Sequence, residues 1–303
     1  MNYSVRRLET SDLSHGMNSF SRYQDPFDIK RFWDPAPTLA GRGVRHFICG
    51  EAQVGKTTLR YHGLRELASL GAYDETHLEL LPRVAKTDQP NRFEISRKGT
   101  GILGLSPVID RWCDIDGAVL ADLLDQLRHP KESAPDAFGK LLKRTDSIAL
   151  VVPARVILES WRREEEGKPL GEFLPGIRQF IQNHVPRKNW EWKGRFQKTL
   201  VVSQSARIVT DDQRKESLRK GVEWFARYTG LNNLIKHAFL VDSIPEEARQ
   251  FGVVPAALTK NGNGKRFGVD EASSAVCSAG VVVAWMLKQL EEAALDSTFI
   301  VKF

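Results

Sequence analysis

The sequence predicts an α/β fold with three layers, in which helices cover both faces of a doubly wound, mainly parallel sheet. Two patterns predict this class. Short and almost wholly apolar segments, which are typical of buried parallel strands, alternate with helical segments from residue 44 to residue 290. In addition, the first strand runs through a glycine-containing loop directly into a helix. No internal repeat is visible in the 303 residues, so we expect one domain over residues 44–303.

Residues 1–43 are predicted to form an irregular N-terminal arm. They lack hydrophobic periodicity and contain several prolines. Phe32 and Trp33 lie among charged residues in this arm. Packing of these two rings on the protein's own surface is the favoured interpretation, and docking of a partner is the alternative.

The loop after the first strand carries the phosphate-binding pattern Gly50-x-x-x-x-Gly55-Lys56-Thr57. Glycines at both ends let the backbone curl so that successive N–H groups point at one anion, and the following helix adds the positive end of its dipole. In this arrangement Lys56 reaches the β- and γ-phosphates of a nucleoside triphosphate, and the Thr57 hydroxyl binds Mg²⁺. The predicted nucleotide-binding residues here are Gly50, Glu51, Ala52, Gln53, Val54, Gly55, Lys56, Thr57 and Thr58. An ordinary glycine turn is the alternative.

The segments on either side of this loop have the structure that the pattern requires. Phe47 and Ile48 end an apolar strand before the loop. After it, Leu59 and Leu64 begin a series of leucines at helical spacing, and Gly71 is a plausible C-terminal stop. Strand, loop and helix therefore follow in the order of a P-loop.

A second motif contains an acidic residue: D-x-x-G, from Asp114 to Gly117. It comes at the end of the next two predicted strands, residues 92–97 and 108–115. An acidic residue at the end of a strand beside the P-loop strand can hold a nucleotide-bound Mg²⁺, so Asp114 is the second predicted metal ligand. The Gly117 N–H is predicted to meet the γ-phosphate. The alternative is that Asp114 and Asp116 are turn-forming aspartates.

The remaining elements continue the alternation. The predicted strands, residues 147–153, 199–203 and 237–241, are short and apolar. Residues 253–268 are predicted to form a loop because N-G-N-G-K-R is a clear turn signal. The predicted helices span residues 118–129, 156–166, 175–184, 212–228 and 270–290, and the small, apolar residues of the last suggest burial against the sheet.

Composition and charge are those of an ordinary globular chain. The net charge of +6 and the pI near 9.2 would help an acidic partner such as a nucleotide to approach, and they are too mild to indicate nucleic acid alone. The longest apolar run, residues 275–287, is too short to cross a membrane, so no span is predicted. The N-terminus has no apolar signal-peptide core, and the three cysteines lie far apart, which favours a reducing cytoplasm.

Residues 186–198 interleave basic residues with Trp190, Trp192 and Phe196. Such mixtures bind nucleic-acid backbones and stack on bases, and tryptophan and arginine also dominate protein interfaces. A loop whose tryptophans cover the edge of the domain is the favoured interpretation. A protein interface comes second, and a nucleic-acid partner is the least favoured.

The order of these motifs resembles that of the P-loop GTPases of the translation-factor-related class, which are Ras-like in architecture. It is more closely similar to that of bacterial double-GTPase and GTPase-associated-system proteins, in which a D-x-x-G strand, a helix and a V-V-P-type strand follow in this order. The resemblance implies binding of GTP and Mg²⁺, slow hydrolysis with Lys56 stabilising charge, and a protein partner that reads the nucleotide state. It also implies a switch threonine that completes the metal site, for which Thr87 is preferred to Thr76 and Thr100.

The base-binding part of the site departs from the family's pattern. The guanine-reading N-K-x-D is expected after the strand at residues 199–203, yet the sequence there is S-Q-S-A-R, which begins at Ser203. Ala206 stands nearest the position of the aspartate that would accept hydrogen bonds from guanine. The family's last base-contacting loop, with its serine, falls at Ser243. Ser203 and Ser243 are therefore the predicted base-side residues, with GTP preferred to ATP only by the resemblance.

The hydrolytic part of the site also departs from the pattern. Ala118 follows Gly117 at the place where many small GTPases carry a water-orienting glutamine. Hydrolysis is therefore expected to be slow, unless Asp116 or an arginine from a partner takes that role. A pseudo-GTPase scaffold that binds nucleotide without turnover and an ATP-using P-loop protein are the alternatives.

Overall fold

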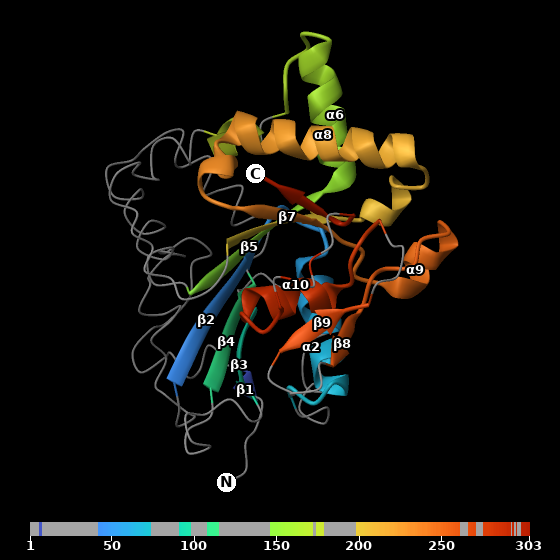
Figure 1. Ribbon diagram of the computed structural model, residues 1–303. Helices are drawn as coiled ribbons and strands as arrows, with labels where there is room; N and C mark the ends of the chain where they lie inside the picture. Colours follow the sequence, from blue (N-terminus) through green and yellow to red (C-terminus); the bar gives the residue numbers. More distant parts are fainter. Residues whose placement is uncertain are drawn as a thin grey trace, which may run out of the picture.

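The computed structural model describes residues 6–7, 42–73, 91–97, 108–114, 146–171, 174–178, 198–260, 266–270, 275–291, 293, 295 and 298–303 (Figure 1). Its centre is an eight-stranded sheet with the order β1-β3-β4-β2-β5-β6-β7-β10. The strands are β1 (Arg6–Arg7), β2 (Arg42–Cys49), β3 (Asn91–Arg97), β4 (Val108–Asp114), β5 (Ser147–Pro153), β6 (Lys198–Ser203), β7 (His237–Leu240) and β10 (Ile300–Lys302).

The pairing directions confirm a doubly wound, mainly parallel sheet. β2 pairs parallel with β4 and β5, and β6 pairs parallel with β5 and β7. Antiparallel pairs occur toward the two edges, where β3 joins β4 and β1, and where β10 joins β7. Because later strands lie on both sides of β2, its carboxyl end is a switch point of the kind where open α/β sheets bind ligands.

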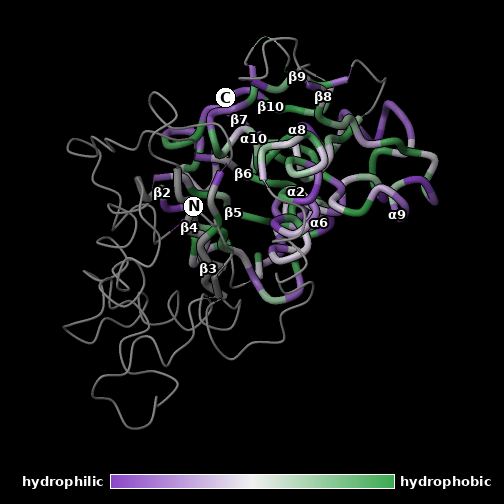
Figure 2. The backbone as a smooth tube through the Cα atoms, turned by 90° about the horizontal axis from the view of Figure 1, so that it is seen from below, coloured by the Kyte–Doolittle hydropathy of each residue, from purple (hydrophilic) through white to green (hydrophobic). Residues whose placement is uncertain are grey.

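Helices cover both faces of the sheet. α2 (Lys56–Ser69) and α10 (Ala279–Met286) pack together on one face, and α6 (Ala154–Glu165) and α8 (Asp212–Thr229) pack together on the other. The sheet has one hydrophobic core on each face, and alternate residues of a strand point into different cores. Ile48 packs in the core beneath α2, whereas Phe47 packs in the core beneath α8. In Figure 2 the hydrophobic colour follows β5 and β10, and hydrophilic stretches lie at the periphery, as around α9 (Pro245–Gln250).

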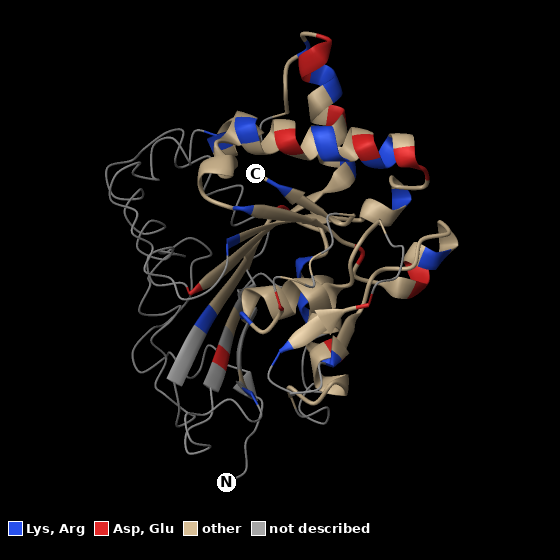
Figure 3. Ribbon diagram, in the orientation of Figure 1, with Lys and Arg blue, Asp and Glu red and all other residues tan. Residues whose placement is uncertain are grey.

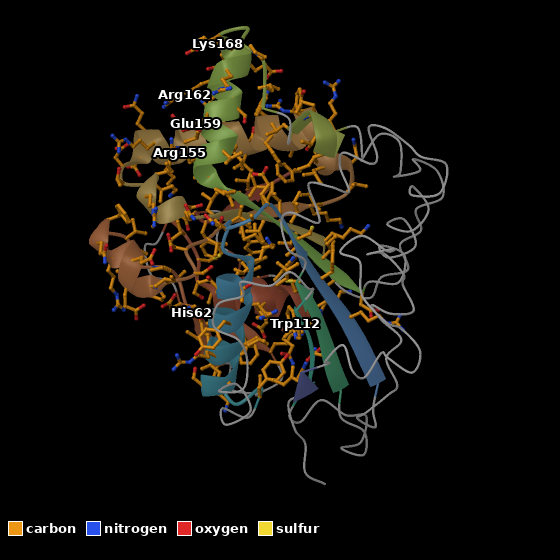
Figure 4. The ribbon with its side chains drawn as sticks, turned by 180° about the vertical axis from the view of Figure 1, so that it is seen from behind. His62, Trp112, Arg155, Glu159, Arg162 and Lys168 are labelled. Atoms are coloured by element: carbon orange, nitrogen blue, oxygen red, sulfur yellow. The ribbon has the colours of Figure 1, made fainter. Side chains whose placement is uncertain are left out.

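Helix α6 projects beyond the sheet, and both α6 and α8 carry basic and acidic residues along their length (Figure 3). Arg155, Glu159, Arg162 and Lys168 lie along this projection (Figure 4). Arg155 and Glu159 form an ion pair at 2.5 Å, and both side chains are exposed. Such pairs contribute little to stability. Within the described part of the chain, no helix is both long and apolar enough to cross a membrane.

The prediction of one long helix over residues 270–290 is wrong. Helix α10 covers only Ala279–Met286, and before it Cys277 forms isolated β-bridges with Val241 and Ala256. Every residue of α10 is buried, so the segment has no amphipathic period from which its start could be read. Residues 253–268, predicted as a loop, contain most of an antiparallel hairpin made of β8 (Leu258–Lys260) and β9 (Phe267–Val269).

The other predicted strands are confirmed, and so are the helices at α6 and α8, with small shifts at their ends. Short 3₁₀ turns follow β6 at Ser205–Arg207 and α8 at Leu231–Asn233. The predicted helix at residues 118–129 and the aromatic and basic residues 186–197 lie outside the described residues. Of the predicted N-terminal arm, residues 6–7 and 42–43 are described. Arg6–Arg7 forms a strand on β3, and Arg42 and Gly43 begin β2, where the sequence predicts irregular structure.

Candidate nucleotide-binding site

The loop between β2 and α2 has the geometry that the glycine pattern predicts. Gly50 leaves the strand with φ 156°, and Gly55 has φ 92° as the N-cap of α2. A side chain at Gly55 would be strained in this left-handed conformation. Leu59 N–H donates to the Gly55 carbonyl at 2.8 Å, which starts the regular helix. Loop amides and a helix N-terminus therefore meet at the carboxyl end of β2, which is an anion-binding arrangement.

The Lys56 ammonium lies inside this loop. Its Nζ donates to the carbonyl oxygens of Gly50, at 3.1 Å, and Glu51, at 2.5 Å, and the residue is only 7% exposed. A charged amine is thus held inside the loop, and two carbonyls compensate its burial. Burial raises the pKa of the Glu51 carboxyl, and the charge of Lys56 partly offsets this.

The remaining loop residues differ in exposure. Ala52 and Gln53 are exposed, Val54 is buried, and Thr57 and Thr58 are half-buried. Gln53 has φ 60°, a left-handed conformation that residues other than glycine rarely adopt. The loop therefore keeps a curled backbone at Gln53 without the glycine that would favour it.

Ser203, at the end of β6, holds the loop from the side. Its hydroxyl donates to the Val54 carbonyl at 2.9 Å, and its own side chain is buried. Two residues later, Ser205 Oγ donates to the Val202 carbonyl at 2.6 Å, and Ser205 N–H donates to the Val241 carbonyl at 3.2 Å. The sequence predicts Ser203 as a base-side residue, and in the structure its hydroxyl is bonded to the Gly50–Gly55 loop.

The carboxyl end of β4 lies beside the start of the loop. Asp114 is paired in register with Ile48, two positions before Gly50. This is the position that the predicted second metal ligand requires, although the Asp114 side chain is not among those described. Thr87, Asp116 and Gly117 also lie outside the described residues, so their proposed roles remain predictions. Among the described side chains, no group of three or more His, Cys, Asp or Glu residues gathers to hold a metal ion.

The loop after β7 contains the second predicted base-side residue, Ser243, which is half-buried. Its neighbour Asp242 is 7% exposed, and the carboxylate accepts hydrogen bonds from the backbone N–H groups of Ala206 and Ile244. Burial raises the pKa of the Asp242 carboxyl. The loops after β6 and β7 therefore contact each other through Asp242, the neighbour of the predicted base-side residue Ser243.

A buried polar network that sequence reasoning missed lies within the sheet, where Asp110 is paired in register with Val44, six positions before Gly50. Asp110 on β4 accepts from His46 Nε2 at 2.8 Å, from Tyr73 Oη at 2.7 Å and from two nitrogens of Arg97, of which Nε is 2.8 Å away. His46 Nδ1 accepts from the Ser147 hydroxyl at 2.6 Å. The network joins β2, β3, β4 and β5, and all five residues are buried.

Charge in this network is balanced locally. Burial alone would raise the pKa of the Asp110 carboxyl, but the Arg97 charge and the His46 hydrogen bond hold it down to about 2. Burial lowers the pKa of His46, so its ring is neutral, with Nε2–H donating to Asp110 and Nδ1 accepting from Ser147. One carboxylate and one guanidinium therefore neutralise each other inside the sheet.

Fold and site together define a P-loop type of α/β protein. A scan against protein-family models and a search of curated proteins found no match. Among solved structures, the Saccharomyces cerevisiae Ski7 GTPase-like domain bound to GDP and inorganic phosphate is similar at 12% identity and a TM-score of 0.33, over 63% of this chain and 41% of that one.

Two further structures are similar at the same level. Sup35 complexed with GMPPNP matches at 16% identity and a TM-score of 0.29, over 63% of this chain and 34% of that one. A probable GTP-binding protein engB matches at 17% identity and a TM-score of 0.31, over 59% of this chain and 79% of that one. The chain thus spans less than half of the Ski7 and Sup35 structures, and these similarities assign it no family.

Proposed function

We propose that this chain binds GTP together with Mg²⁺ and acts as a slow GTPase switch in the cytoplasm, whose nucleotide state is read by a protein partner. The observation that carries the proposal is the Lys56 ammonium inside the Gly50–Gly55 loop, at the N-terminus of α2. A backbone cradle with a fixed positive charge suits the β- and γ-phosphates of a nucleotide. The carboxyl end of β4 beside it suits a metal ligand at Asp114.

The chemistry would be in-line attack of water on the γ-phosphate. Lys56 and the loop amides would stabilise the negative charge that develops on the phosphate oxygens. The Thr57 hydroxyl and Asp114 would hold Mg²⁺, which neutralises phosphate charge when it is bound. Thr87, Gly117 and Asp116 would complete the metal, γ-phosphate and water contacts. Ala118 in place of a glutamine supports a slow reaction.

A non-hydrolysing scaffold is the second candidate, and the same Ala118 favours it. The two candidates differ in turnover but not in binding. Single-turnover hydrolysis of GTP, measured with the chain alone and with candidate protein partners, separates them. A slow, Mg²⁺-dependent release of phosphate identifies a switch, whereas binding without any release identifies a scaffold.

Replacing Lys56 with alanine is expected to abolish detectable binding of GTP and GDP. The change removes the positive charge that faces the phosphates, and charge-assisted hydrogen bonds contribute about 1.5–3 kcal/mol each. Titration calorimetry with each nucleotide in the presence of Mg²⁺ measures the effect. Lys220→Ala is the matched control, because Lys220 is exposed on α8, in the opposite layer. Full binding by Lys56→Ala would refute the proposed function.

Replacing Gly50 with alanine is expected to damage the loop itself. A Cβ at this position would lie 2.4 Å from the Val151 backbone oxygen, which cannot move without shifting β5. Overpacking of this kind costs about 1–3 kcal/mol of stability, and the loop amides would turn away from the phosphate. Thermal unfolding with and without GDP reads out both effects. Gly171→Ala, where a Cβ meets nothing within 4 Å, should behave as the parent does; equal GDP stabilisation of both variants would contradict the assignment.

A further inference from the structure

The loops that follow β6 and β7 contact each other beside the Gly50–Gly55 loop. β6 and β7 pair in parallel, with Val202 opposite Leu240, so their carboxyl ends lie at the same edge of the sheet. Ser203 connects this edge to the phosphate loop through its bond to Val54. A nucleotide whose phosphates lie at Lys56 therefore has these two loops within its reach on the β6 side.

Asp242 is the acidic side chain held between these two loops. Its carboxylate accepts from the Ala206 N–H and, at 3.5 Å, from the Ile244 N–H. A carboxylate has about four acceptor sites, so two backbone donors leave capacity for a ligand. Arg207, a cation whose charge acts on Asp242, forms its own ion pair with Glu247 at 3.3 Å. No cation in the described residues forms an ion pair with Asp242.

The unused acceptor sites suit one nucleobase better than another. Guanine presents two adjacent donors, N1–H and the 2-amino group, whereas adenine presents an unprotonated N1 at the same edge. A desolvated carboxylate binds the first pattern and is repelled by the lone pair of the second. The chain carries Ala206 where a guanine-reading aspartate is expected, and Asp242 accepts a hydrogen bond from the backbone N–H of that same alanine.

We propose that Asp242 is the residue that selects guanine, so that the base-reading carboxylate comes from the loop after β7 instead of the loop after β6. This inference rests on the proposed GTP binding and deepens it by naming the specificity residue. A purely structural role for Asp242, bracing the loop at Ala206, needs only an acceptor oxygen. An asparagine keeps that oxygen, so the two roles respond differently to Asp242→Asn.

Asp242→Asn is expected to exchange guanine preference for xanthine preference. Xanthine keeps N1–H but has a carbonyl in place of the 2-amino group, and the asparagine amide offers one acceptor and one donor to match it. GDP affinity should fall by about 10- to 100-fold, and XDP affinity should rise to near the parental GDP value. Competition of GDP, XDP and ADP against a fluorescent GDP on the full chain with Mg²⁺ measures all three affinities.

Asp211→Asn is the matched control. Asp211 is exposed, lies in the connection between β6 and α8, and caps α8 by accepting from Arg214 N–H at 2.8 Å, a role that asparagine also fills. This variant should keep the parental order of affinities. A gain of XDP binding by Asp242→Asn cannot result from misfolding, so it supports the proposal.

The outcomes separate this inference from the proposed function. If the parent prefers GDP and Asp242→Asn binds GDP and XDP as the parent does, Asp242 does not read the base, and the proposed function stands. If the parent binds GDP and ADP equally, base selection at Asp242 is overturned while nucleotide binding stands. If the parent binds none of the three nucleotides, the proposed function itself fails.

Discussion

Replacing Asp110 with alanine is expected to lower the free energy of unfolding by about 3–5 kcal/mol, because removal of one partner leaves a buried charge unpaired. The charge left unpaired would be that of Arg97, which is 5% exposed and donates to Asp110 through two nitrogens. Tyr73 and His46 would lose an acceptor in the same place. A loss of this size is a large fraction of the stability of a typical domain.

Chemical denaturation monitored by circular dichroism measures this loss. Asp110→Asn should cost less than Asp110→Ala, because an amide oxygen still accepts one hydrogen bond although the charge on Arg97 remains unbalanced. Glu159→Ala is the control for removal of a carboxylate, since Glu159 is exposed and pairs with Arg155 on the surface of α6. Equal costs for Asp110→Ala and Glu159→Ala would contradict a stabilising network.

The pH dependence of the free energy of unfolding tests whether the charge of Asp110 causes this loss of stability. Asp110 has a pKa of about 2 in the folded protein, below its ordinary value of 3.8. Because the pKa is depressed by folding, the carboxylate's contribution is complete above the unfolded value and is lost as pH falls through the folded value. The stability gap between the parent and Asp110→Asn should therefore narrow between about pH 4 and pH 2. A stability difference that stayed constant over this pH range would show that packing, and not the charge of Asp110, causes the loss.

The phosphate loop could be predicted from the sequence because its information is local. Gly50, Gly55 and Lys56 lie in one short loop and at the start of the helix that follows it. Their spacing alone predicts the backbone path of the loop and the position of the lysine amine. The parallel sheet was also readable, since buried strands are continuous apolar runs. The pairing of Asp114 with the P-loop strand followed from strand order, and the structure agrees.

Contacts between distant segments could not be predicted in this way. Ser203 and Val54 are 149 positions apart, and His46 and Asp110 are 64 apart. A lone aspartate in the segment V-I-D-R-W-C-D gives no sign of the arginine and histidine that face it. The bounds of helix α10 could not be predicted for a different reason. A segment that is apolar on every side has no hydrophobic period from which its ends can be located.

Replacing Glu66 with alanine is expected to loosen the C-terminal part of the domain and to cost about 3 kcal/mol, since buried donors left without an acceptor cost about 1–3 kcal/mol each. Glu66 projects from the P-loop helix α2. Its carboxylate accepts from Leu258 N–H at 2.7 Å, from Ser278 Oγ at 2.9 Å and from Gly280 N–H at 3.0 Å. It therefore fastens both β8 and the start of α10.

Through its bond to Gly280, Glu66 of α2 also caps the N-terminus of α10. The N-cap residue of α10, Ser278, makes no side-chain capping bond of its own, and its hydroxyl instead donates to Glu66. The carboxylate accepts from one of the first N–H groups of α10, which would otherwise be buried without an acceptor. Loss of Glu66 thus weakens the packing of α10 against α2, the two helices that cover the phosphate-loop side of the sheet.

Hydrogen exchange of the backbone amides measures this effect where it arises. In Glu66→Ala, the amides of Leu258 and Gly280 should exchange faster, while those of α8 on the opposite face should keep most of their protection. Arg65→Ala is the matched control, because Arg65 is the next residue on α2 and its side chain is exposed. Glu66→Gln should lie between the two, since its amide has one acceptor oxygen for three donors. Parental exchange at both amides in Glu66→Ala would show that the carboxylate does not hold the C-terminal segment on α2.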